Sequence, residues 1–329
     1  MGSHLRHRMI DNGPLILDGG LATQLEAQGC NLKGDPLWSA RLLHTYPQAI
    51  REAHYRFLLS GADVVTTATY QASVTGFVNH LDMSSECARE LLMSGVHLAK
   101  ETVEKFVSDS RPTGQSCPLV AGSVGPYGAF LLNGSEYTGV YAENMSIEEF
   151  KVWHRPQIDC LVAAGADVIA LETIPSIKEA EALLELLREF PNSKAWLSFS
   201  CRDGRCISDG SLFTDAVQLA NRSMQLVAVG VNCCAPTVVE PLLESARSLL
   251  SPDLSWVVYP NSGEDWDSEQ GWLTSGNRSA SIPELSQTWL KQGAALIGGC
   301  CRISPADIAE LKQQLKGSRT SPASAVSAD

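Results

Sequence analysis

The amino-acid sequence predicts an α/β fold, a single (β/α)8 TIM-type barrel with extended loops at the carboxyl face of its strands. Eight short runs of β-branched and apolar residues recur, at residues 15–18, 63–67, 118–123, 167–172, 195–200, 226–232, 255–259 and 295–298. Most are separated by stretches with the apolar spacing of an amphipathic helix, such as residues 177–189. Strands that alternate with helices are typical of βα units and a parallel sheet.

A short glycine motif supports this alternation. Gly-Ala-Asp or Gly-Ala-Ala occurs at residues 61–63, 165–167 and 293–295, each time where a helix should stop and a strand begin. Glycine adopts the left-handed conformation at little cost and therefore commonly ends helices. Eight such units within 329 residues favour a closed barrel over an open doubly wound sheet.

The pattern indicates one structured domain, at residues 12–316, because no break in composition divides it. Residues 1–11 are polar and begin Met-Gly-Ser-His, which is typical of an expression tag on a flexible N-terminus. Residues 317–329 are rich in Ser and Ala without apolar periodicity, which predicts a disordered tail.

The charge balance excludes several classes of partner. Lys and Arg total 25 against 37 for Asp and Glu, a formal net charge of -12, so nucleic acid and anionic membranes would be repelled. The sequence has no apolar run near the roughly 18 residues that span a bilayer, and no signal-peptide stretch. We expect a cytoplasmic protein that acts on small molecules, with no nucleic-acid or membrane partner.

The ten cysteines fall into two groups. Six are scattered and are interpreted as small packing residues: Cys30, Cys87, Cys117, Cys160, Cys201 and Cys206. The pair at 233–234 ends the sixth predicted strand, and the pair at 300–301 ends the eighth. Because the carboxyl ends of barrel strands share one rim, these two pairs should approach each other.

Clustered thiols in a cytosolic chain indicate metal binding more often than disulfides. Thiolates prefer zinc, and three of them leave the fourth tetrahedral position for a substrate, as in a catalytic site. A kink at Gly298 and Gly299 would let both following thiols point inward. Spacing alone also admits the alternative that Cys300 and Cys301 are merely small packing residues.

Two predicted connections are longer than barrel closure requires. They span residues 125–143, which include Glu136 and Tyr137, and residues 260–282, which include Trp266 and Trp272. Both follow the carboxyl ends of strands, where barrel enzymes build their active sites. We expect them to enclose a substrate, although decorative insertions are the alternative.

These motifs together resemble the homocysteine S-methyltransferase family, over nearly the whole chain. The matching segments lie at residues 18–20, 35–40, 69–73, 122–128, 134–137, 172–173, 230–233, 258–264 and 298–302. The resemblance implies a barrel with Zn²⁺ held by Cys233, Cys300 and Cys301, and leaves Cys234 as a neighbour. The tyrosine-rich loop and residues 259–264 look like the branch that uses S-methylmethionine rather than betaine.

The implied reaction moves a methyl group from a sulfonium donor to the thiol of homocysteine and yields methionine. S-methylmethionine is the expected donor, with S-adenosylmethionine a weaker one. In the betaine branch, a tyrosine after the fourth-strand glutamate is thought to occupy the vacant zinc position. Here that residue is Thr173, so we expect water in the fourth position.

Homocysteine carries an ammonium and a carboxylate, and the resemblance suggests an anchor for each. Asp18 and Glu172, at the ends of the first and fourth strands, are expected to receive the ammonium. The amides of Gly19 and Gly20, which open a helix, are expected to bind the carboxylate. The alternatives are that Asp18 caps that helix and that Glu172 pairs with a buried arginine.

The remaining candidate residues are aromatic or polar. Aromatic faces and carboxylates hold sulfonium cations, which makes Trp38, Glu136 and Tyr137 candidates for the donor site. Trp38 could equally be a core residue. Tyr70 is expected to pack on the carbon chain of the acceptor, and Asn232, which precedes Cys233, is a further candidate for substrate binding.

Two other functions deserve comparison with methyl transfer. A barrel metallohydrolase would use histidine and carboxylate ligands, so the cysteine-only set disfavours it. A zinc- or thiol-storage protein would lack turnover, and the predicted ammonium- and carboxylate-binding positions disfavour that function.

Overall fold

The computed structural model describes residues 13–110, 116–263, 265–267, 271–273 and 281–317. Its main sheet has eight strands in the order β1-β10-β7-β6-β5-β4-β3-β2. They are β1 (Leu15–Ile16), β2 (Val64–Thr66), β3 (Leu119–Val124), β4 (Val168–Ile174), β5 (Ala195–Phe199), β6 (Leu226–Asn232), β7 (Ser255–Tyr259) and β10 (Ala294–Ile297). Each neighbouring pair is parallel, and a parallel bridge between Leu17 and Val64 brings β1 beside β2. The sheet therefore closes, and the predicted (β/α)8 barrel is confirmed.

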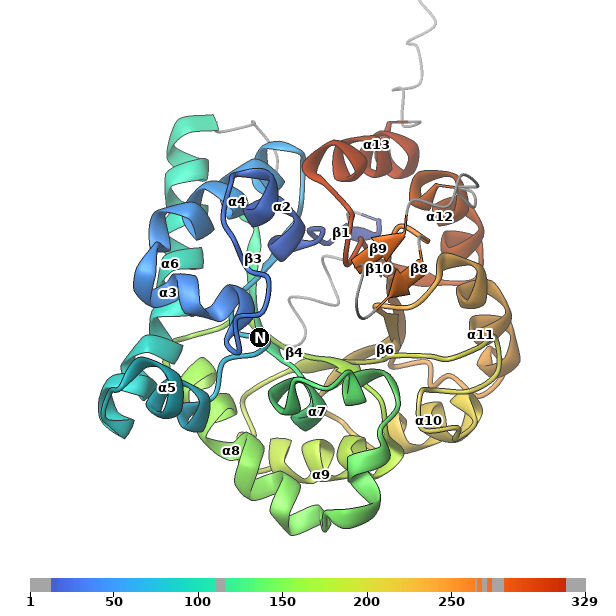
Figure 1. Ribbon diagram of the computed structural model, residues 1–329. Coiled ribbons are helices and arrows are strands. Elements are labelled where there is room, and N and C mark those ends of the chain that lie inside the picture. Colours follow the sequence, from blue (N-terminus) through green and yellow to red (C-terminus); the bar gives the residue numbers. More distant parts are fainter. Residues whose placement is uncertain (1–12, 111–115, 264, 268–270, 274–280, 318–329) are drawn as a thin grey trace, which may run out of the picture.

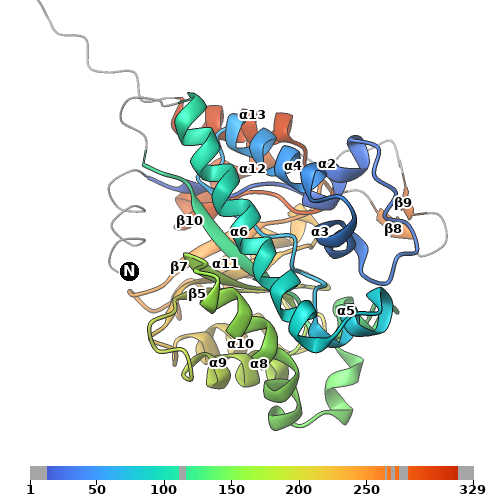
Figure 2. The ribbon, with the colours of Figure 1, turned by 90° about the vertical axis from the view of Figure 1, so that its left-hand side faces the viewer.

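Helices surround the strands on all sides (Figure 1), and the long helix α6 lies across the outside of the sheet in the side view of Figure 2. They are α2 (Leu21–Ala27), α3 (Leu42–Thr45), α4 (Pro47–Leu59), α5 (Val74–Leu81), α6 (Ser85–Ser110), α7 (Tyr127–Leu131), α8 (Ile147–Ala163), α9 (Ile177–Leu187), α10 (Phe213–Ala220), α11 (Val239–Ala246), α12 (Ile282–Lys291) and α13 (Pro305–Lys316). Short 3-10 turns are η1 (Trp38–Arg41), η2 (Ser135–Tyr137), η3 (Val140–Asn144) and η4 (Pro236–Val238).

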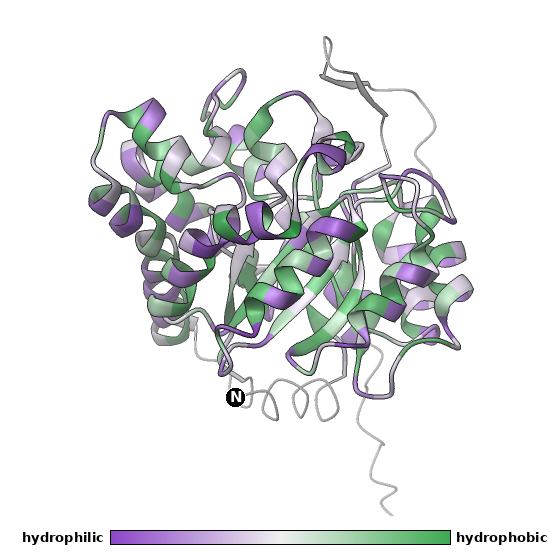
Figure 3. Cartoon of the chain, turned by 90° about the horizontal axis from the view of Figure 1, so that it is seen from below, coloured by the Kyte–Doolittle hydropathy of each residue, from purple (hydrophilic) through white to green (hydrophobic). Residues whose placement is uncertain are grey.

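The strands are buried on both faces, which explains why they read as continuous apolar runs. One face fills the barrel interior, where Leu15, Ala170, Trp196 and Leu296 meet. The other face packs against the helices, as when Leu183 of α9 joins the larger core cluster. In Figure 3 hydrophobic residues follow the strands, while the outer helices alternate between hydrophobic and hydrophilic residues.

The glycines of the repeated motif have the conformation that the sequence predicts. Gly61, Gly165 and Gly293 have φ angles of 99°, 83° and 100°. Each follows the last turn of a helix and precedes a strand by a few residues at most. The predicted strands differ from the observed ones by at most two residues at either end.

The two long connections are more ordered than loops. Residues 125–143 contain α7, η2 and most of η3. Residues 260–282 include a two-stranded antiparallel hairpin, β8 (Asp265–Asp267) and β9 (Gly271–Leu273). This hairpin was not predicted from the sequence. Trp266 and Trp272 are partners in its register, and tryptophan favours strands. The hairpin lies at the same end of the barrel as α3 (Figure 2).

The predictions for residues 1–11, and for all but the first residue of 317–329, lie outside the described residues. Within the described part of the chain, no helix is both long and apolar enough to cross a membrane.

Candidate metal centre and substrate site

Three cysteine sulfurs meet at the carboxyl rim of the barrel. The Sγ atom of Cys233 lies 2.7 Å from that of Cys300 and 3.9 Å from that of Cys301. All three lie within 4.8 Å of one another, the one such group of three or more His, Cys, Asp or Glu side chains among the described residues. Cys233 is separated by 67 positions from Cys300, and the neighbouring positions of β6, β7 and β10 in the sheet bring them together.

The glycines before the cysteine pair serve close packing. A Cβ atom on Gly298 would lie 2.6 Å from Cβ of Leu17, and one on Gly299 would lie 2.3 Å from Cγ2 of Ile303. Neither glycine has a positive φ angle, so the predicted kink does not arise from a left-handed backbone conformation at these glycines. The Cys300 amide donates to the Pro260 carbonyl at 2.8 Å, and the Cys301 amide donates to Oδ1 of Asn261 at 3.2 Å.

The chemistry of this cluster fits a soft divalent cation. The pKa of Cys300 is raised mainly by its hydrogen bonds to Cys233 and Cys301, and to a smaller extent by burial. Hydrogen bonds to Cys233 and Cys300 lower the pKa of Cys301. One thiolate is thus favoured, whereas three thiolates at this spacing would repel one another unless a cation neutralised them.

Cys234 lies apart from this cluster although it is adjacent in sequence. Its side chain is 4% exposed and belongs to the apolar core between strands and helices. Burial raises the pKa of its thiol far above the usual value. Of the two cysteines that follow β6, only Cys233 belongs to the three-sulfur group.

Two buried acids lie near the same rim. Asp18 follows β1 and accepts hydrogen bonds from the Thr66 amide at 2.7 Å and the Thr66 hydroxyl at 2.9 Å. The N-cap of α2 is Gly20, so Asp18 is not the helix cap. Glu172 in β4 accepts hydrogen bonds from the hydroxyls of Ser123 and Tyr259, and these take the place of the arginine considered above.

Burial raises the pKa of both acids to about 7. Hydrogen bonds from Thr66 oppose this shift at Asp18, whereas the charge of Glu172 adds to it. The two carboxylates therefore resist being ionised together, and a cation between them would relieve the repulsion. This electrostatic pattern suits the ammonium group of an amino acid.

The two glycines after Asp18 lie against the segment that carries the cysteine pair. A Cβ atom on Gly19 would lie 2.4 Å from the Ile303 carbonyl oxygen, and one on Gly20 would lie 2.7 Å from that of Cys300. The Gly20 amide already donates to the Ile303 carbonyl at 2.9 Å. Of the two amides expected to bind a carboxylate, Gly19 is therefore the better candidate.

Asn232 forms hydrogen bonds with Thr173, and its contact with substrate stays a prediction. Its Oδ1 accepts from the Thr173 amide at 2.7 Å, and its Nδ2 donates to the Thr173 hydroxyl at 2.8 Å. Asn232 is fully buried, and Thr173 has a φ angle of 60°. Both ends of the Asn232 amide are thus engaged in fixing the end of β4.

Aromatic side chains lie beside the thiols. The Tyr137 hydroxyl is 3.7 Å from Sγ of Cys233. Tyr70 forms a hydrogen bond with Thr173 and packs edge-on against Trp38, with ring centroids 6.2 Å apart. Trp38 is half-buried and also contacts the apolar cluster under α4 and α6, so it has both a core contact and a site contact.

Glu136 contributes an unusual carboxylate to this group. Its Oε2 atom is buried and has no hydrogen-bond partner among the described residues. Burial, with a smaller contribution from Cys233, raises the pKa of Glu136. A cationic ligand beside Tyr137 would offset the cost of burying this carboxylate.

Comparisons with known proteins identify the family. The family model described as homocysteine S-methyltransferase matches residues 15–315. The chain belongs to the homocysteine S-methyltransferase family. It is 44% identical to the homocysteine S-methyltransferase of Escherichia coli K12, over 91% of this chain and 94% of that one. It is 40% identical to a betaine-homocysteine S-methyltransferase of Drosophila melanogaster, over 95% of this chain and 97% of that one.

A solved structure agrees. The metallated form of the homocysteine methyltransferase MmuM from Escherichia coli superposes with a TM-score of 0.83 at 41% identity, covering 94% of this chain and 99% of that one. The resemblance of the sequence to the homocysteine S-methyltransferases is thereby confirmed.

The supporting residues of this family member were not singled out from sequence. Tyr259 accepts from the Trp196 indole at 2.9 Å and lies 2.6 Å from the Ser198 hydroxyl, which orients it toward Glu172. The sequence signal that could have indicated these residues is a polar side chain at the end of an apolar strand, as at Ser123 and Tyr259. The side chains of Trp266 and Trp272 lie outside the described residues.

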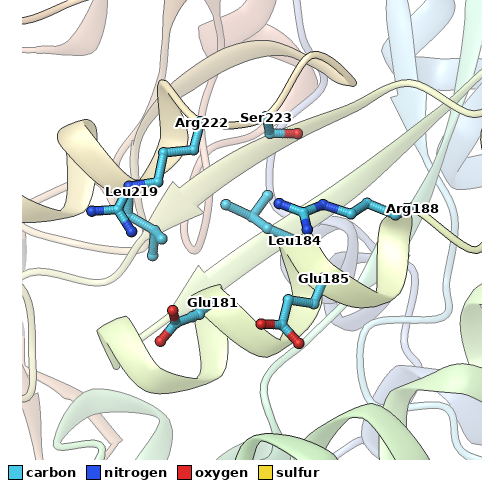
Figure 4. Close-up of a pocket in the computed structure, with 7 residues that line it drawn as sticks. All are labelled: Glu181, Leu184, Glu185, Arg188, Leu219, Arg222 and Ser223. Carbon is cyan, nitrogen blue, oxygen red and sulfur yellow. The ribbon is translucent and has the colours of Figure 1, made fainter.

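One further hollow in this homocysteine S-methyltransferase lies between the outer helices α9 and α10 (Figure 4). Its volume is about 70 Å³, far below the roughly 300 Å³ of small ligand pockets. Arg188 and Arg222 line it at the carboxyl ends of these helices, which is the rim opposite the cysteines.

Proposed function

We propose that this chain transfers a methyl group from a sulfonium donor to the thiol of homocysteine, giving methionine, with zinc held by Cys233, Cys300 and Cys301. The observation that carries the proposal is the convergence of three sulfurs within 4.8 Å at the barrel rim. A set of three thiolates suits zinc and leaves one coordination position for a substrate.

Methyl transfer requires a thiolate, yet a thiol with a pKa of about 8.5 is only a few per cent ionised at neutral pH. When bound, zinc would act as a Lewis acid and favour the thiolate form of the homocysteine sulfur near pH 7. The half-buried positions of Cys300 and Cys301 would then leave the substrate sulfur accessible to the donor. No separate general base is needed, and water is our proposal for the fourth position in the absence of substrate.

The acceptor is held by its amino-acid group. Asp18 and Glu172 bind the ammonium, since both carboxylates are buried and neither has an arginine or lysine among its hydrogen-bonding partners in the described residues. The Gly19 amide binds the carboxylate, and Tyr70 packs on the carbon chain. Thr66, Ser123 and Tyr259 hold the two acids in place through their hydrogen bonds.

The donor lies on the side of Trp38, Glu136 and Tyr137. Aromatic faces attract a sulfonium cation, and the unpartnered Oε2 of Glu136 supplies the opposite charge. The Tyr137 hydroxyl lies 3.7 Å from Sγ of Cys233, so a donor beside Tyr137 would lie close to a sulfur bound at the cysteine group. We propose S-methylmethionine as the main donor and S-adenosylmethionine as a weaker one.

A cytoplasmic location is part of the proposal, because three reduced thiols persist best in a reducing compartment.

The test combines donor choice with metal content. Purified protein is assayed for methionine with S-methylmethionine, S-adenosylmethionine or betaine, before and after zinc is removed and restored. We expect turnover with the sulfonium donors, its loss on chelation and its recovery with zinc. Turnover with betaine alone, or full turnover without metal, would contradict the proposal.

Cysteine variants assign the ligands. We expect one zinc per chain in the native protein and in Cys234→Ala, because Cys234 faces the apolar core. Cys233→Ala, Cys300→Ala and Cys301→Ala should each lose most of their zinc and reduce turnover at least 100-fold. Full zinc occupancy in any of these three variants would remove that residue from the ligand set.

A further inference from the structure

A buried carboxylate beneath the Tyr137 loop has no part in the chemistry above. Glu179 lies in the first turn of α9 and is fully buried. Its Oε1 accepts from the Tyr127 amide at 2.7 Å and lies 2.8 Å from Nε2 of His154, itself buried on α8. Its Oε2 accepts from the Tyr141 hydroxyl. One side chain thus joins α9 to α7, η3 and α8.

Two of these partners bracket the donor residues in sequence. Tyr127 begins α7 and Tyr141 lies in η3, and Glu136 and Tyr137 lie between them in η2. The rings of Tyr127 and Tyr141 pack edge-on with centroids 5.6 Å apart. The position of this turn therefore depends on both tyrosines.

The packing inside the segment leaves little room for independent movement. A Cβ atom on Gly128 would lie 2.5 Å from the ring of Tyr141 and 2.6 Å from the amide nitrogen of Glu136. Ser200 donates to the Glu136 carbonyl at 2.9 Å, and Lys178 donates to the Ala142 carbonyl at 2.8 Å. A shift of Tyr141 would displace the Glu136 backbone.

Burying a carboxylate costs stability unless hydrogen bonds compensate it. The neighbouring residues on α9, Ala180 and Leu183, are apolar and buried, so an apolar residue at 179 would suit the core. Burial and the charge of Glu179 raise the pKa of Tyr141, which keeps its hydroxyl protonated as a donor. The hydrogen bonds of Glu179 therefore join α9 to this segment in a way that an apolar residue at 179 would not.

We propose that Glu179, together with His154 and Tyr141, positions the loop that carries Glu136 and Tyr137 and thereby sets the affinity for the sulfonium donor. These three residues touch neither substrate and act through the loop. The two proposed ammonium anchors of the acceptor lie outside this segment, because Asp18 follows β1 and Glu172 lies in β4. The inference rests on the proposed function for its choice of substrate, whereas the anchoring itself does not.

The most informative variant is Tyr141→Phe, which removes one hydroxyl and keeps the ring packing. We expect the KM for S-methylmethionine to rise roughly 10-fold, as the loss of one buried hydrogen bond allows. The KM for homocysteine should stay within about twofold. An equal rise of both KM values, or no rise in either, would overturn the proposal.

Glu179→Gln provides the conservative rescue. Its carbonyl oxygen can accept from the Tyr127 amide and from His154, and its amide group can donate to the Tyr141 oxygen. We expect a donor KM closer to the native value than in Glu179→Ala, which leaves three groups unpartnered. The matched control is Glu185→Ala, a half-buried position on the same helix, and it should leave both KM values unchanged.

Hydrogen exchange of residues 128–144 tests the anchoring independently of turnover. Exchange should be faster in Tyr141→Phe than in the native protein or in Glu185→Ala. Unchanged exchange would overturn the anchoring, and faster exchange with an unchanged donor KM would overturn the link to the donor.

If the native protein failed to use sulfonium donors, the proposed function would fall. Hydrogen exchange would then still test the anchoring, and calorimetric measurement of S-methylmethionine binding would test the link to the donor.

Discussion

Thr173 and Cys233, at the ends of β4 and β6, have φ angles of 60° and 50°, a conformation that costs a non-glycine residue about 1–2 kcal/mol. Asn232 offsets the cost at Thr173 with two hydrogen bonds. At Cys233 the amide donates to the Tyr259 carbonyl at 3.3 Å. Local strain is thus retained where it turns a side chain toward the rim, as is common at functional sites.

Glu172 illustrates a conflict between stability and binding at the same scale. Its pKa is raised from 4.5 to about 7 by burial, so the folded state binds a proton more tightly than the unfolded state. Stability from this group is therefore full below about pH 4.5 and is lost as pH rises toward 7. A shift of this size corresponds to roughly 3 kcal/mol.

We therefore predict that Glu172→Gln raises the melting temperature at pH 8 and leaves it nearly unchanged at pH 5. The same variant should bind the amino-acid substrate at least 10-fold more weakly, since it loses the charge that we propose meets the ammonium. Differential scanning calorimetry and the homocysteine KM provide the two measurements. A lower melting temperature at pH 8 would contradict the assigned cause of the pKa shift.

Binding of methionine, which has no thiol, separates the acids from thiol ionisation. Asp18 and Glu172 both have a pKa of about 7, so they ionise as pH rises from 6 to 8. We expect the Kd of methionine to fall over this range in the native protein, and to fall less in Glu172→Gln. Titration calorimetry at several pH values would reveal a flat profile if the acids do not bind the ammonium.

At the scale of elements, the site depends on how closely β6, β7 and β10 approach one another. Gly230 of β6 pairs with Val257 of β7, and a Cβ atom there would lie 1.9 Å from the Val257 carbonyl oxygen. Cys233 lies three residues after Gly230, at the end of β6, and the Cys300 amide donates to the Pro260 carbonyl just after β7. Displacement of β7 would therefore reach both halves of the cysteine group.

Gly230→Ala should destabilise the protein by about 3 kcal/mol or more, because the neighbouring atom is backbone and cannot rotate away. Gly122→Ala on β3 is the matched control, since its closest atoms are side-chain carbons at 3.2 Å. We expect a clearly smaller loss of unfolding free energy for the control in urea denaturation. Equal losses would show that the Gly230 contact is not the decisive one.

For the whole molecule, a metal held by Cys233, Cys300 and Cys301 would link the end of β6 to the end of β10 across β7. A ligand that binds only the folded state stabilises it according to its concentration and affinity. The stability of the folded state and the occupancy of the metal site should therefore be coupled.

Chelation of zinc should lower the melting temperature of the native protein by roughly 5 °C or more. Cys301→Ala should melt at the same temperature with and without chelator, because it lacks a complete ligand set. Cys234→Ala should respond as the native protein does. Insensitivity of the native protein to both chelator and added zinc would show that the thiol group does not hold metal.

The sequence by itself determined the barrel and the positions of its strands. Through the family resemblance it also indicated Cys233, Cys300 and Cys301 as the candidate metal ligands. Strand runs, helix spacing and the glycine motif at residues 61–63, 165–167 and 293–295 are local signals, because each arises from neighbouring residues along the chain. The resemblance to the homocysteine S-methyltransferases was equally readable, since its motifs are contiguous segments.

Only the tertiary structure decided which polar groups meet. It placed Cys234 in the apolar core, engaged Asn232 with Thr173, and bonded the Gly20 amide to Ile303. It also revealed Tyr259 beside Glu172, and Glu179 bonded to Tyr127 and Tyr141 on either side of η2. Such contacts join residues far apart in the chain, and hydrogen bonding depends on distance and direction that no local pattern encodes.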